Sequence, residues 1–290
     1  IRRRTWRSKG RRGRSPCATP SCSNGRCGRA LLRHGRVRQS SWRQSQSRLK
    51  AIGRARVQAV TTNDTALSLV DTVVVLGGFP ALAGASFQVR EGELVALRGA
   101  NGSGKSTLLR ACAGLVPVAR GTMRVLGVDL GARSTTNSSA MRRHVGLLGH
   151  KNGLYADLTA RENVQFAARL VGASDNDVDE ALTRLGIDAR VAATRAVSLS
   201  AGQRRRTALA SLVVRRARLW LLDEPHAGLD SAARIELDAI LRDATRAGAT
   251  VVYTTHEVAN AATPNTAIVP RTITLAGGVV ASDVPGGGAR

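Results

Sequence analysis

The chain has 290 residues, which is enough for one large domain or two modest ones. Its formal net charge is +24, but residues 1–60 hold 18 of the 44 Lys and Arg residues and no Asp or Glu. The excess charge therefore belongs mainly to this N-terminal segment, and the rest is a mildly basic globular protein. Because no run of 18 apolar residues occurs and the N-terminal charges precede no apolar region, neither a transmembrane helix nor a secretory signal is expected.

Residues 1–65 are expected to form a disordered, Arg-rich tail, because they are rich in Arg, Ser and Gly and lack a sustained hydrophobic period. One interpretation is an arm that binds nucleic acid. The interpretation that we favour is an artefact of the chosen start. The chain begins with Ile1 and its first methionine is Met123, and a non-Met start within about Leu49–Leu67 would explain both facts.

The first half of the remaining chain predicts a strand-rich start to the fold. Glycine and proline at Gly77, Gly78 and Pro80 are expected in the turn between the first two strands. A helix is expected over Ser106–Ala113, with Cys112 on its apolar face. The short apolar runs that predict strands are Leu67–Leu76, Ala85–Val89, Glu93–Arg98, Gly121–Leu126 and His144–Leu148.

The second half alternates helices and strands, which predicts a mostly parallel sheet covered by helices. Thr159 and Glu162 have capping-box spacing, which predicts a helix over Ala160–Val171. Further helices are expected over Ser174–Leu185, Arg204–Val214 and Ala232–Ala247. Strands are expected over Leu219–Leu222 and Ala249–Thr254, followed by a hairpin of Thr272–Ala276 with Val279–Ser282.

The segment GANGSGKST matches the phosphate-binding pattern G-x-x-x-x-G-K-[ST] between a predicted strand and a predicted helix. Glycines let backbone N–H groups surround a polyphosphate, and the helix dipole favours negative charge there. Lys105 is expected to contact the β- and γ-phosphates and the Ser106 hydroxyl to bind Mg²⁺. The alternative, a glycine-rich turn without a ligand, does not explain this context. The residues expected to bind nucleotide are Gly99, Asn101, Gly102, Ser103, Gly104, Lys105, Ser106 and Thr107.

Two acids follow the buried run Leu219–Leu222, at the strand end where such sheets bind ligands. Asp223 is expected to support the Mg²⁺ shell, and Glu224 to polarise the water that attacks the γ-phosphate. The alternative for this pair is two surface acids after a strand. His256 follows Ala249–Thr254 and could contact the γ-phosphate, whereas a lone histidine is usually a satisfied or exposed side chain.

The segment LSAGQRRR, Leu199–Arg206, combines a serine, a glycine and a helix start, which are features of a second anion site. It lies far along the chain from the phosphate loop. Two chains that face each other head to tail would bring it to the phosphate more easily than one chain. Arg204–Arg206 are interpreted as a solvated helix face rather than as a phosphate or lipid contact.

The motifs GANGSGKST, LSAGQ, LLDEP, AGLD and TTHE occur in the order and spacing of ATP-binding-cassette ATPases, over about Ala66–Ser282. The resemblance implies an α/β fold of the P-loop NTPase type: a mostly parallel core sheet with an antiparallel β lead-in and a helical subdomain. It implies an ATPase domain at 66–285, a helical subdomain at about 152–203 and a C-terminal tail at 286–290.

The family implies ATP and Mg²⁺ as cofactors and a pair of ATPase subunits, either a homodimer or two different chains. Glu224 resembles the family's catalytic base and His256 its γ-phosphate switch, while Asp230 lies in the segment that couples the two sites. The residues implied to contact ATP from the opposite subunit are Ser200, Ala201, Gly202 and Gln203.

The resemblance further implies a transporter ATPase that lies peripherally at the cytoplasmic face of the cell membrane, bound to separate integral membrane subunits, with no nucleic acid as partner. The segments LLGHKNGLYADLTAREN and LSAGQRRRTALA resemble the haem-exporter ATPases of cytochrome c maturation. The alternatives are a soluble cassette ATPase of DNA repair or translation, which would usually carry a coiled coil or two cassettes, and a nucleic-acid-binding protein that acts through its tail.

Two positions depart from the family pattern. Lys151 stands where the family usually has a Gln that binds Mg²⁺ and senses the membrane partner, and a protonated Lys cannot ligate a cation. Leu76 stands where an aromatic residue usually stacks on adenine, and Phe79 is a nearby substitute.

Overall fold

The structure is a computed structural model, and it describes residues 64–131, 139–255 and 269–287. All of these residues belong to one compact unit, Val57–Arg290. The predicted tail at 1–65 therefore lies outside the described residues, apart from its last two positions.

An antiparallel sheet with the strand order β2-β1-β4-β5 opens the described part of the chain. Its strands are β1 (Thr65–Leu76), β2 (Phe79–Arg90), β4 (Arg120–Val125) and β5 (Val128–Asp129). The hairpin between β1 and β2 turns at Gly77 and Gly78, both with positive φ. The placement of Pro80 in this turn is wrong, because Pro80 lies in β2. As an edge strand of this sheet, β2 tolerates a residue without an N–H donor.

A second sheet has the order β10-β9-β3-β8-β7-β6. Parallel pairing joins β9 to β3, β3 to β8, β8 to β7 and β7 to β6, and β10 joins β9 through an antiparallel hairpin. Almost every residue of β3, β7 and β8 is buried or nearly so, as in parallel strands that are covered on both faces. The strands are β3 (Leu94–Arg98), β6 (Val145–Leu148), β7 (Leu219–Leu222), β8 (Thr250–Thr254), β9 (Arg271–Ala276) and β10 (Val279–Val284).

Helix α2 (Lys105–Cys112) packs against strands of both sheets in one hydrophobic core. Leu108, Leu109 and Cys112 on α2 share this core with Leu67 of β1 and Leu97 of β3. The predicted burial of Cys112 is confirmed, and burial raises the pKa of its thiol to about 12, so that it acts as a small apolar side chain.

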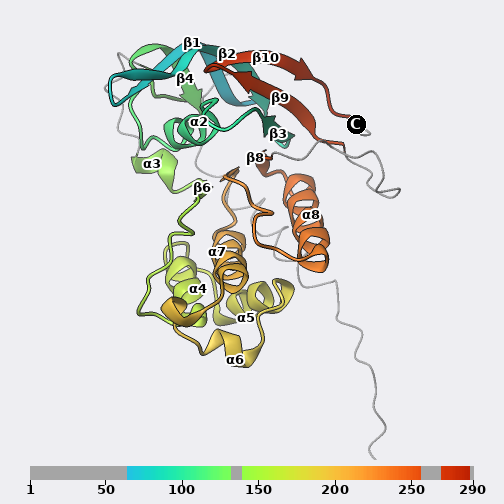
Figure 1. The fold of residues 1–290 in the computed structure, drawn as a ribbon. Helices are drawn as coiled ribbons and strands as arrows, with labels where there is room; N and C mark the ends of the chain where they lie inside the picture. Colours follow the sequence, from blue (N-terminus) through green and yellow to red (C-terminus); the bar gives the residue numbers. More distant parts are fainter. Residues whose placement is uncertain (1–63, 132–138, 256–268, 288–290) are drawn as a thin grey trace, which may run out of the picture. The chain divides into compact units, whose positions relative to one another are not determined.

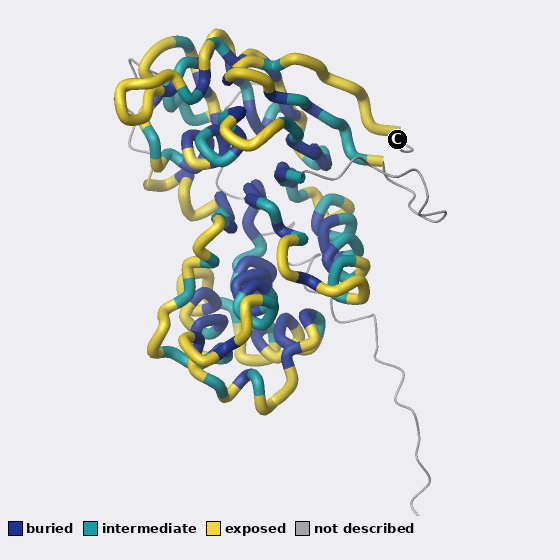
Figure 2. The backbone as a smooth tube through the Cα atoms, in the orientation of Figure 1, coloured by how far each residue is buried: buried dark blue, intermediate teal, exposed yellow. Residues whose placement is uncertain are grey.

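Four helices pack together in a second core, which also includes the buried face of α8 (Ser231–Arg246). They are α4 (Ala160–Arg169), α5 (Asp175–Arg184), α6 (Ala189–Ala192) and α7 (Ala201–Arg215), which Figure 1 shows grouped around α7. The predicted capping box of Thr159 and Glu162 is confirmed at the start of α4. Figure 2 shows buried residues along α7, in the strands β6, β7 and β8, and again around α2 and β3.

Helix α7 begins at Ala201, three residues before the predicted start at Arg204. The sequence also did not predict the one-turn helix α3 (Ser139–Arg142), α6, or the 3₁₀ turn η1 (Ala196–Ser198). These differences leave the predicted α/β fold class confirmed: a mostly parallel core sheet, an antiparallel β lead-in and a group of helices.

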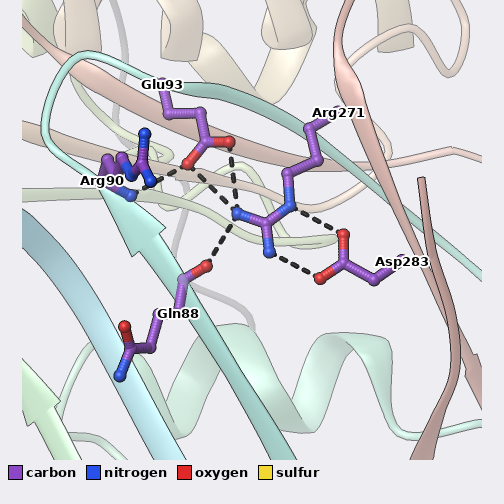
Figure 3. Close-up of polar contacts among 5 residues, drawn as sticks. All are labelled: Gln88, Arg90, Glu93, Arg271 and Asp283. Carbon is purple, nitrogen blue, oxygen red and sulfur yellow. Dashed lines mark hydrogen bonds and ion pairs between the residues drawn. The ribbon is translucent and has the colours of Figure 1, made fainter. Parts of the chain in front are cut away.

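Arg271 on β9 ties strands of the two sheets together (Figure 3). Its Nε and Nη2 donate to the Asp283 carboxylate at 2.7 and 2.5 Å, a bidentate pair with β10. Its Nη1 donates to the carbonyl of Gln88 on β2 at 2.8 Å and to the Glu93 carboxylate at 3.2 and 3.3 Å. The hydrogen bonds to Asp283 raise the pKa of Arg271, and those from Arg271 lower the pKa of Asp283.

The pair predicts a pH-dependent contribution to stability. Because its folded-state pKa is lowered, ionised Asp283 stabilises the folded chain above its unfolded-state pKa of about 4, and this contribution is lost as the pH falls through the lower folded-state pKa. We therefore expect Asp283→Asn to unfold at a lower urea concentration than the wild type at about pH 7, with the difference shrinking below about pH 4. Asp179→Asn, which removes a more exposed ion pair with Arg161, is the control and should change the midpoint little. If Asp283→Asn lowers the urea midpoint equally at about pH 7 and below about pH 4, the ionised Asp283 carboxylate does not stabilise the fold through Arg271.

Candidate functional site

The parallel sheet brings four chain segments to one edge. Strands β3, β8, β7 and β6 are consecutive neighbours and run in the same direction. Their carboxyl ends lead into Gly99, Thr255, Asp223 and Gly149, respectively. Ligands of parallel α/β sheets bind at this edge. The phosphate loop and the Asp223–Glu224 pair, which are far apart in the sequence, therefore flank the end of β8.

The loop before α2 takes a path that only glycine allows. Gly99, Gly102 and Gly104 have φ angles of 144°, 80° and 99°. A Cβ on Gly99 would lie 2.3 Å from the carbonyl oxygen of Leu275 on β9. A Cβ on Gly104 would lie 2.4 Å from the carbonyl oxygen of Ala81 on β2. The loop is thus pressed between strands of the two sheets, and its conformation is fixed by the fold.

The N-terminus of α2 has the features of an anion site. Gly104 is its N-cap and offers no side-chain cap, and the first turn contains no acid. The first N–H groups of a helix lack partners within the helix and attract negative charge. Beside them, the Ser103 Oγ is buried without a hydrogen-bond partner in the described part of the chain. Lys105 is 6% exposed, and its Nζ donates to the carbonyls of Gly99 and Ala100 at 2.8 and 2.9 Å. An uncapped helix start, a buried cation and an unpartnered hydroxyl together fit a phosphate group.

Thr254, at the end of β8, orients both acids that follow β7. Its Oγ1 donates to Asp223 Oδ1 at 3.0 Å and accepts from the Glu224 N–H at 2.7 Å. Asp223 is 7% exposed, and its N–H donates to the Leu148 carbonyl at 2.7 Å. Glu224 has φ 48°, a left-handed conformation that costs a residue other than glycine about 1–3 kcal/mol. The sequence assigned a role to His256 of the TTHE motif but none to Thr254, which is the first residue of that motif and the last residue of the buried strand β8.

Arg205, on the first turns of α7, holds the same stretch of backbone. Its Nη2 donates to the carbonyls of Asp223 and Glu224, the latter at 2.6 Å, and its Nε to the Pro225 carbonyl at 3.4 Å. Its Nη1 donates to the Gly149 carbonyl at 3.0 Å and to Asn152 Oδ1 at 2.9 Å. Burial lowers the pKa of Arg205, and the carboxylates of Asp223 and Glu224 oppose this shift.

The interpretation of Arg204–Arg206 as a solvated face is therefore wrong for Arg205, which is 5% exposed. Arg205 precedes the buried Leu209 and Leu212 by four and seven residues, which places it on the apolar face of α7. Helical periodicity, applied to a helix that begins at Ala201, would have identified it.

The LSAGQ segment forms the start of α7. Ser200 is the N-cap: its Oγ accepts from the Gln203 N–H at 3.2 Å, and Gln203 Oε1 accepts from the Ser200 N–H at 2.9 Å. A Cβ on Gly202 would lie 3.0 Å from the Gly228 carbonyl oxygen, so the segment lies against the AGLD stretch. Two residues further, Asp230 caps α8 by accepting from the Ala233 N–H at 2.8 Å. Both helix starts thus lie next to one another on a surface where Ser200 and Asp230 are exposed.

The two positions that depart from the family pattern are exposed, as is Phe79. Lys151 follows β6 and is exposed. Phe79 is 78% exposed and Leu76 41%, and the two pair across the β1–β2 hairpin. Phe79 precedes Ala81, the residue that approaches Gly104, by two positions on β2, so its ring stands on a strand that borders the phosphate loop. His256 lies outside the described residues.

Comparisons with known proteins agree on one family. A family model described as ABC transporter matches residues 82–227, half of the chain. The cytochrome c biogenesis ATP-binding export protein CcmA of Bordetella bronchiseptica is 43% identical over 170 residues, 58% of this chain and 74% of that protein. The protein of the same name from Paramagnetospirillum magneticum is 39% identical over 198 residues, 67% of this chain and 89% of that protein. Among solved structures, the chain is similar to the dimeric post-hydrolysis state of the ATP-binding cassette MJ0796 bound to ADP and Pi, with a TM-score of 0.66. The sequence identity is 26%, and the match covers 75% of this chain and 97% of that one.

The glycine geometry of the phosphate loop yields a paired prediction. Gly102 and Gly104 both have positive φ, but only a Cβ on Gly104 meets an atom within 4 Å. We expect Gly102→Ala to lower the free energy of unfolding by about 1–2 kcal/mol through backbone strain alone. Gly104→Ala should cost about 1–3 kcal/mol more, because the loop must move away from β2. Urea unfolding of both variants measures the difference, and equal losses would show that the close approach to Ala81 is not a constraint.

Proposed function

We propose that this chain, which belongs to the ABC transporter family and is the ATP-hydrolysing subunit of a transporter, binds Mg²⁺-ATP at the carboxyl edge of its parallel sheet. The observation that carries this proposal is that the uncapped start of α2 and the acids Asp223 and Glu224 follow the carboxyl ends of β3 and β7, the two strands that flank β8. Phosphate would bind the residues of the loop, Gly99, Asn101, Gly102, Ser103, Gly104, Lys105, Ser106 and Thr107.

The donor set at this edge fits Mg²⁺, which prefers oxygen ligands and usually combines one or two protein side chains with phosphate oxygens. We propose that the Ser106 hydroxyl and the Asp223 carboxylate hold it. Thr254 fixes the orientation of the Asp223 carboxylate through its hydrogen bond to Oδ1. When bound, the ion would neutralise charge on the β- and γ-phosphates.

Glu224 is the proposed general base. It is partly buried at the end of β7, where its carboxylate could polarise a water in line with the γ-phosphate. Lys105 would leave the carbonyls of Gly99 and Ala100 and donate to phosphate oxygens. For His256 the proposal rests on the sequence alone, in which it follows Thr255, the residue after β8.

We propose that a second ATPase chain, in the simplest case another copy, completes each site. Ser200 and Gly202 lie at an exposed helix start with Ala201 and Gln203, which is suited to an anion held by a facing subunit. Asp230 lies at the adjacent start of α8 and would link the two sites. The solved cassette MJ0796 is a dimer, which supports the arrangement.

We also propose a place for this ATPase in the cell. No helix in the described residues is long and apolar enough to cross a membrane. Separate integral membrane subunits would receive the motion of the ATPase pair at the cytoplasmic face, where the chain would lie peripherally. The relatives named as export proteins of cytochrome c biogenesis support haem as the cargo of the transporter. The ATPase domain would occupy 66–285, with the helical subdomain at about 152–203.

Glu224→Gln tests the catalytic assignment. We expect ATP hydrolysis to fall by about 10²–10⁴-fold, because an amide cannot act as a general base, while ATP binding is retained. In cells that depend on this chain, c-type cytochromes should then be absent. Glu180→Gln, an exposed glutamate on α5, is the matched control and should leave both readouts unchanged. If Glu224→Gln hydrolyses ATP at the wild-type rate, Glu224 is not the general base. If a strain whose ATPase is inactive still makes normal c-type cytochromes, haem is not the cargo.

Phe79→Ala tests the adenine contact. Stacking of a base on an aromatic ring contributes about 1–3 kcal/mol, so we expect the Kd for ATP to rise by about tenfold and the Kd for triphosphate without a base to stay unchanged. Leu170→Ala, another exposed apolar residue at 64% exposure, is the control. If Phe79→Ala binds ATP as tightly as the wild type, the ring does not contact the base.

A further inference from the structure

Arg205 uses all of its hydrogen-bonding capacity inside the protein. A guanidinium has five N–H donors, and the structure gives Arg205 five acceptors. Four of them are backbone carbonyls, and the fifth is a side-chain amide oxygen. None of its acceptors is a carboxylate, so the residue does not form an ion pair by these contacts. Its role is to fix backbone positions.

These acceptors come from two segments that follow the paired strands β6 and β7. Beyond the ends of these strands, backbone pairing no longer holds the two segments together. One segment is Asp223–Pro225, which leaves β7, and the other is 149–152, which leaves β6. The last backbone contact between them along the strands is the hydrogen bond from the Asp223 N–H to the Leu148 carbonyl. Beyond that bond, Arg205 bridges the two segments, with its Nη1 on Gly149 and Asn152 and its Nη2 and Nε on the Asp223–Pro225 carbonyls.

The geometry at Glu224 shows what this bridge restrains. Glu224 has a left-handed backbone, and a residue other than glycine keeps that conformation only when its surroundings enforce it. The Glu224 N–H donates to Thr254 Oγ1 at 2.7 Å, and the Glu224 carbonyl accepts from Arg205 Nη2 at 2.6 Å. The direction of the Cα–Cβ bond of Glu224 follows from its backbone angles, so both contacts restrict the region that the carboxylate can reach.

We propose that Arg205 is a positioning residue for ATP hydrolysis: it holds the Glu224 backbone in the reactive conformation and couples it, through Asn152, to the loop after β6. The proposal rests on the assignment of Glu224 as general base. Asn152 is next to Lys151, the residue that replaces the family's Gln and cannot bind a cation while protonated. A displacement of this loop therefore reaches Glu224 through the Arg205 guanidinium rather than through a ligand of the bound ion.

The coupling requires the shape of the guanidinium as well as its charge. Lysine has three N–H donors on a single nitrogen, whereas the five acceptors are distributed over the three nitrogens of a planar fork. A Lys at position 205 would keep the positive charge but would lose the bridge to one of the two segments. Charge and bridge can therefore be separated by substitution.

The experiment measures ATP hydrolysis by the full chain with Mg²⁺, and expresses kcat per bound nucleotide so that any misfolded fraction drops out. We expect Arg205→Lys and Arg205→Gln each to lower kcat by at least about tenfold, with KM for ATP within about twofold of the wild type. Asn152→Ala should lower kcat less, because the contacts to Asp223–Pro225 remain. In the Arg205→Lys background, Asn152→Ala should have little further effect, since the two residues act through one bridge.

Two controls on the same helix separate positioning from stability. Arg206→Gln removes a neighbouring arginine, whose Nη1 donates to the Gly186 carbonyl at 3.2 Å, and should leave kcat unchanged. Leu212→Ala removes a buried side chain of α7 and should lower the unfolding midpoint without changing kcat per bound nucleotide. If Leu212→Ala lowers kcat per bound nucleotide as much as Arg205→Lys does, the effect of Arg205 is structural and the proposal fails.

The outcomes also distinguish this proposal from the one on which it rests. If Glu224→Gln abolishes hydrolysis but both Arg205 variants keep kcat within twofold, the role of Arg205 is wrong and that of Glu224 stands. An effect of the Arg205 variants that appears in KM alone would likewise overturn the proposal. If Glu224→Gln hydrolyses ATP normally, the general-base assignment fails first.

Discussion

The parallel pairing of β3, β8, β7 and β6 is the constraint on which the rest of the site depends. It places the carboxyl ends of four strands side by side, although the corresponding residues are separated by up to about 150 positions in the sequence. Backbone pairing sets only where each segment leaves the sheet. The path of the chain beyond the sheet edge depends on side chains, and it is determined differently after β3 and after β7.

On the β3 side, the path is set by the absence of side chains. Gly99 and Gly104 let the loop pass within a few ångströms of carbonyls on β9 and β2, and this leaves the N–H groups at the start of α2 uncapped. The antiparallel lead-in thus borders the loop at which we propose that phosphate binds. Arg271 and the core around α2 tie that lead-in to the parallel sheet.

On the β7 side, the path is set by buried polar side chains. Thr254 and Arg205 hold the residues after β7 from two different elements, a neighbouring strand and a helix of the second core. Because the exposed Ser200 caps the start of α7, the same helix carries both the surface turn and the internal bridge. A force on the start of α7 or on the loop after β6 therefore reaches Glu224 through one rigid group.

The sequence predicted the parts that follow from short-range chemistry. The glycine pattern of the phosphate loop and the capping box at Thr159 depend on residues a few positions apart, and each has a distinctive spacing. Pro80 was misplaced because its tolerance depends on β2 being an edge strand, which is a property of the sheet. Arg205 was misread because a run of three arginines indicates a solvated face, while its five acceptors come from residues 18 to 56 positions away. When a buried charged side chain finds its hydrogen-bond acceptors far along the chain, the neighbouring sequence does not reveal them. Only the helical period indicates that the side chain faces the core.

The central claim is that two chains enclose ATP between the sheet edge of one and the start of α7 of the other. The most direct test is the mass in solution of Glu224→Gln, saturated with ATP and Mg²⁺, compared with the same chain carrying Ser200→Arg in addition. The account predicts twice the mass of one chain for the first, with ATP retained, and the mass of one chain for the second, because the added side chain blocks the facing phosphate. A Glu224→Gln chain that binds ATP fully and keeps the mass of one chain would contradict it.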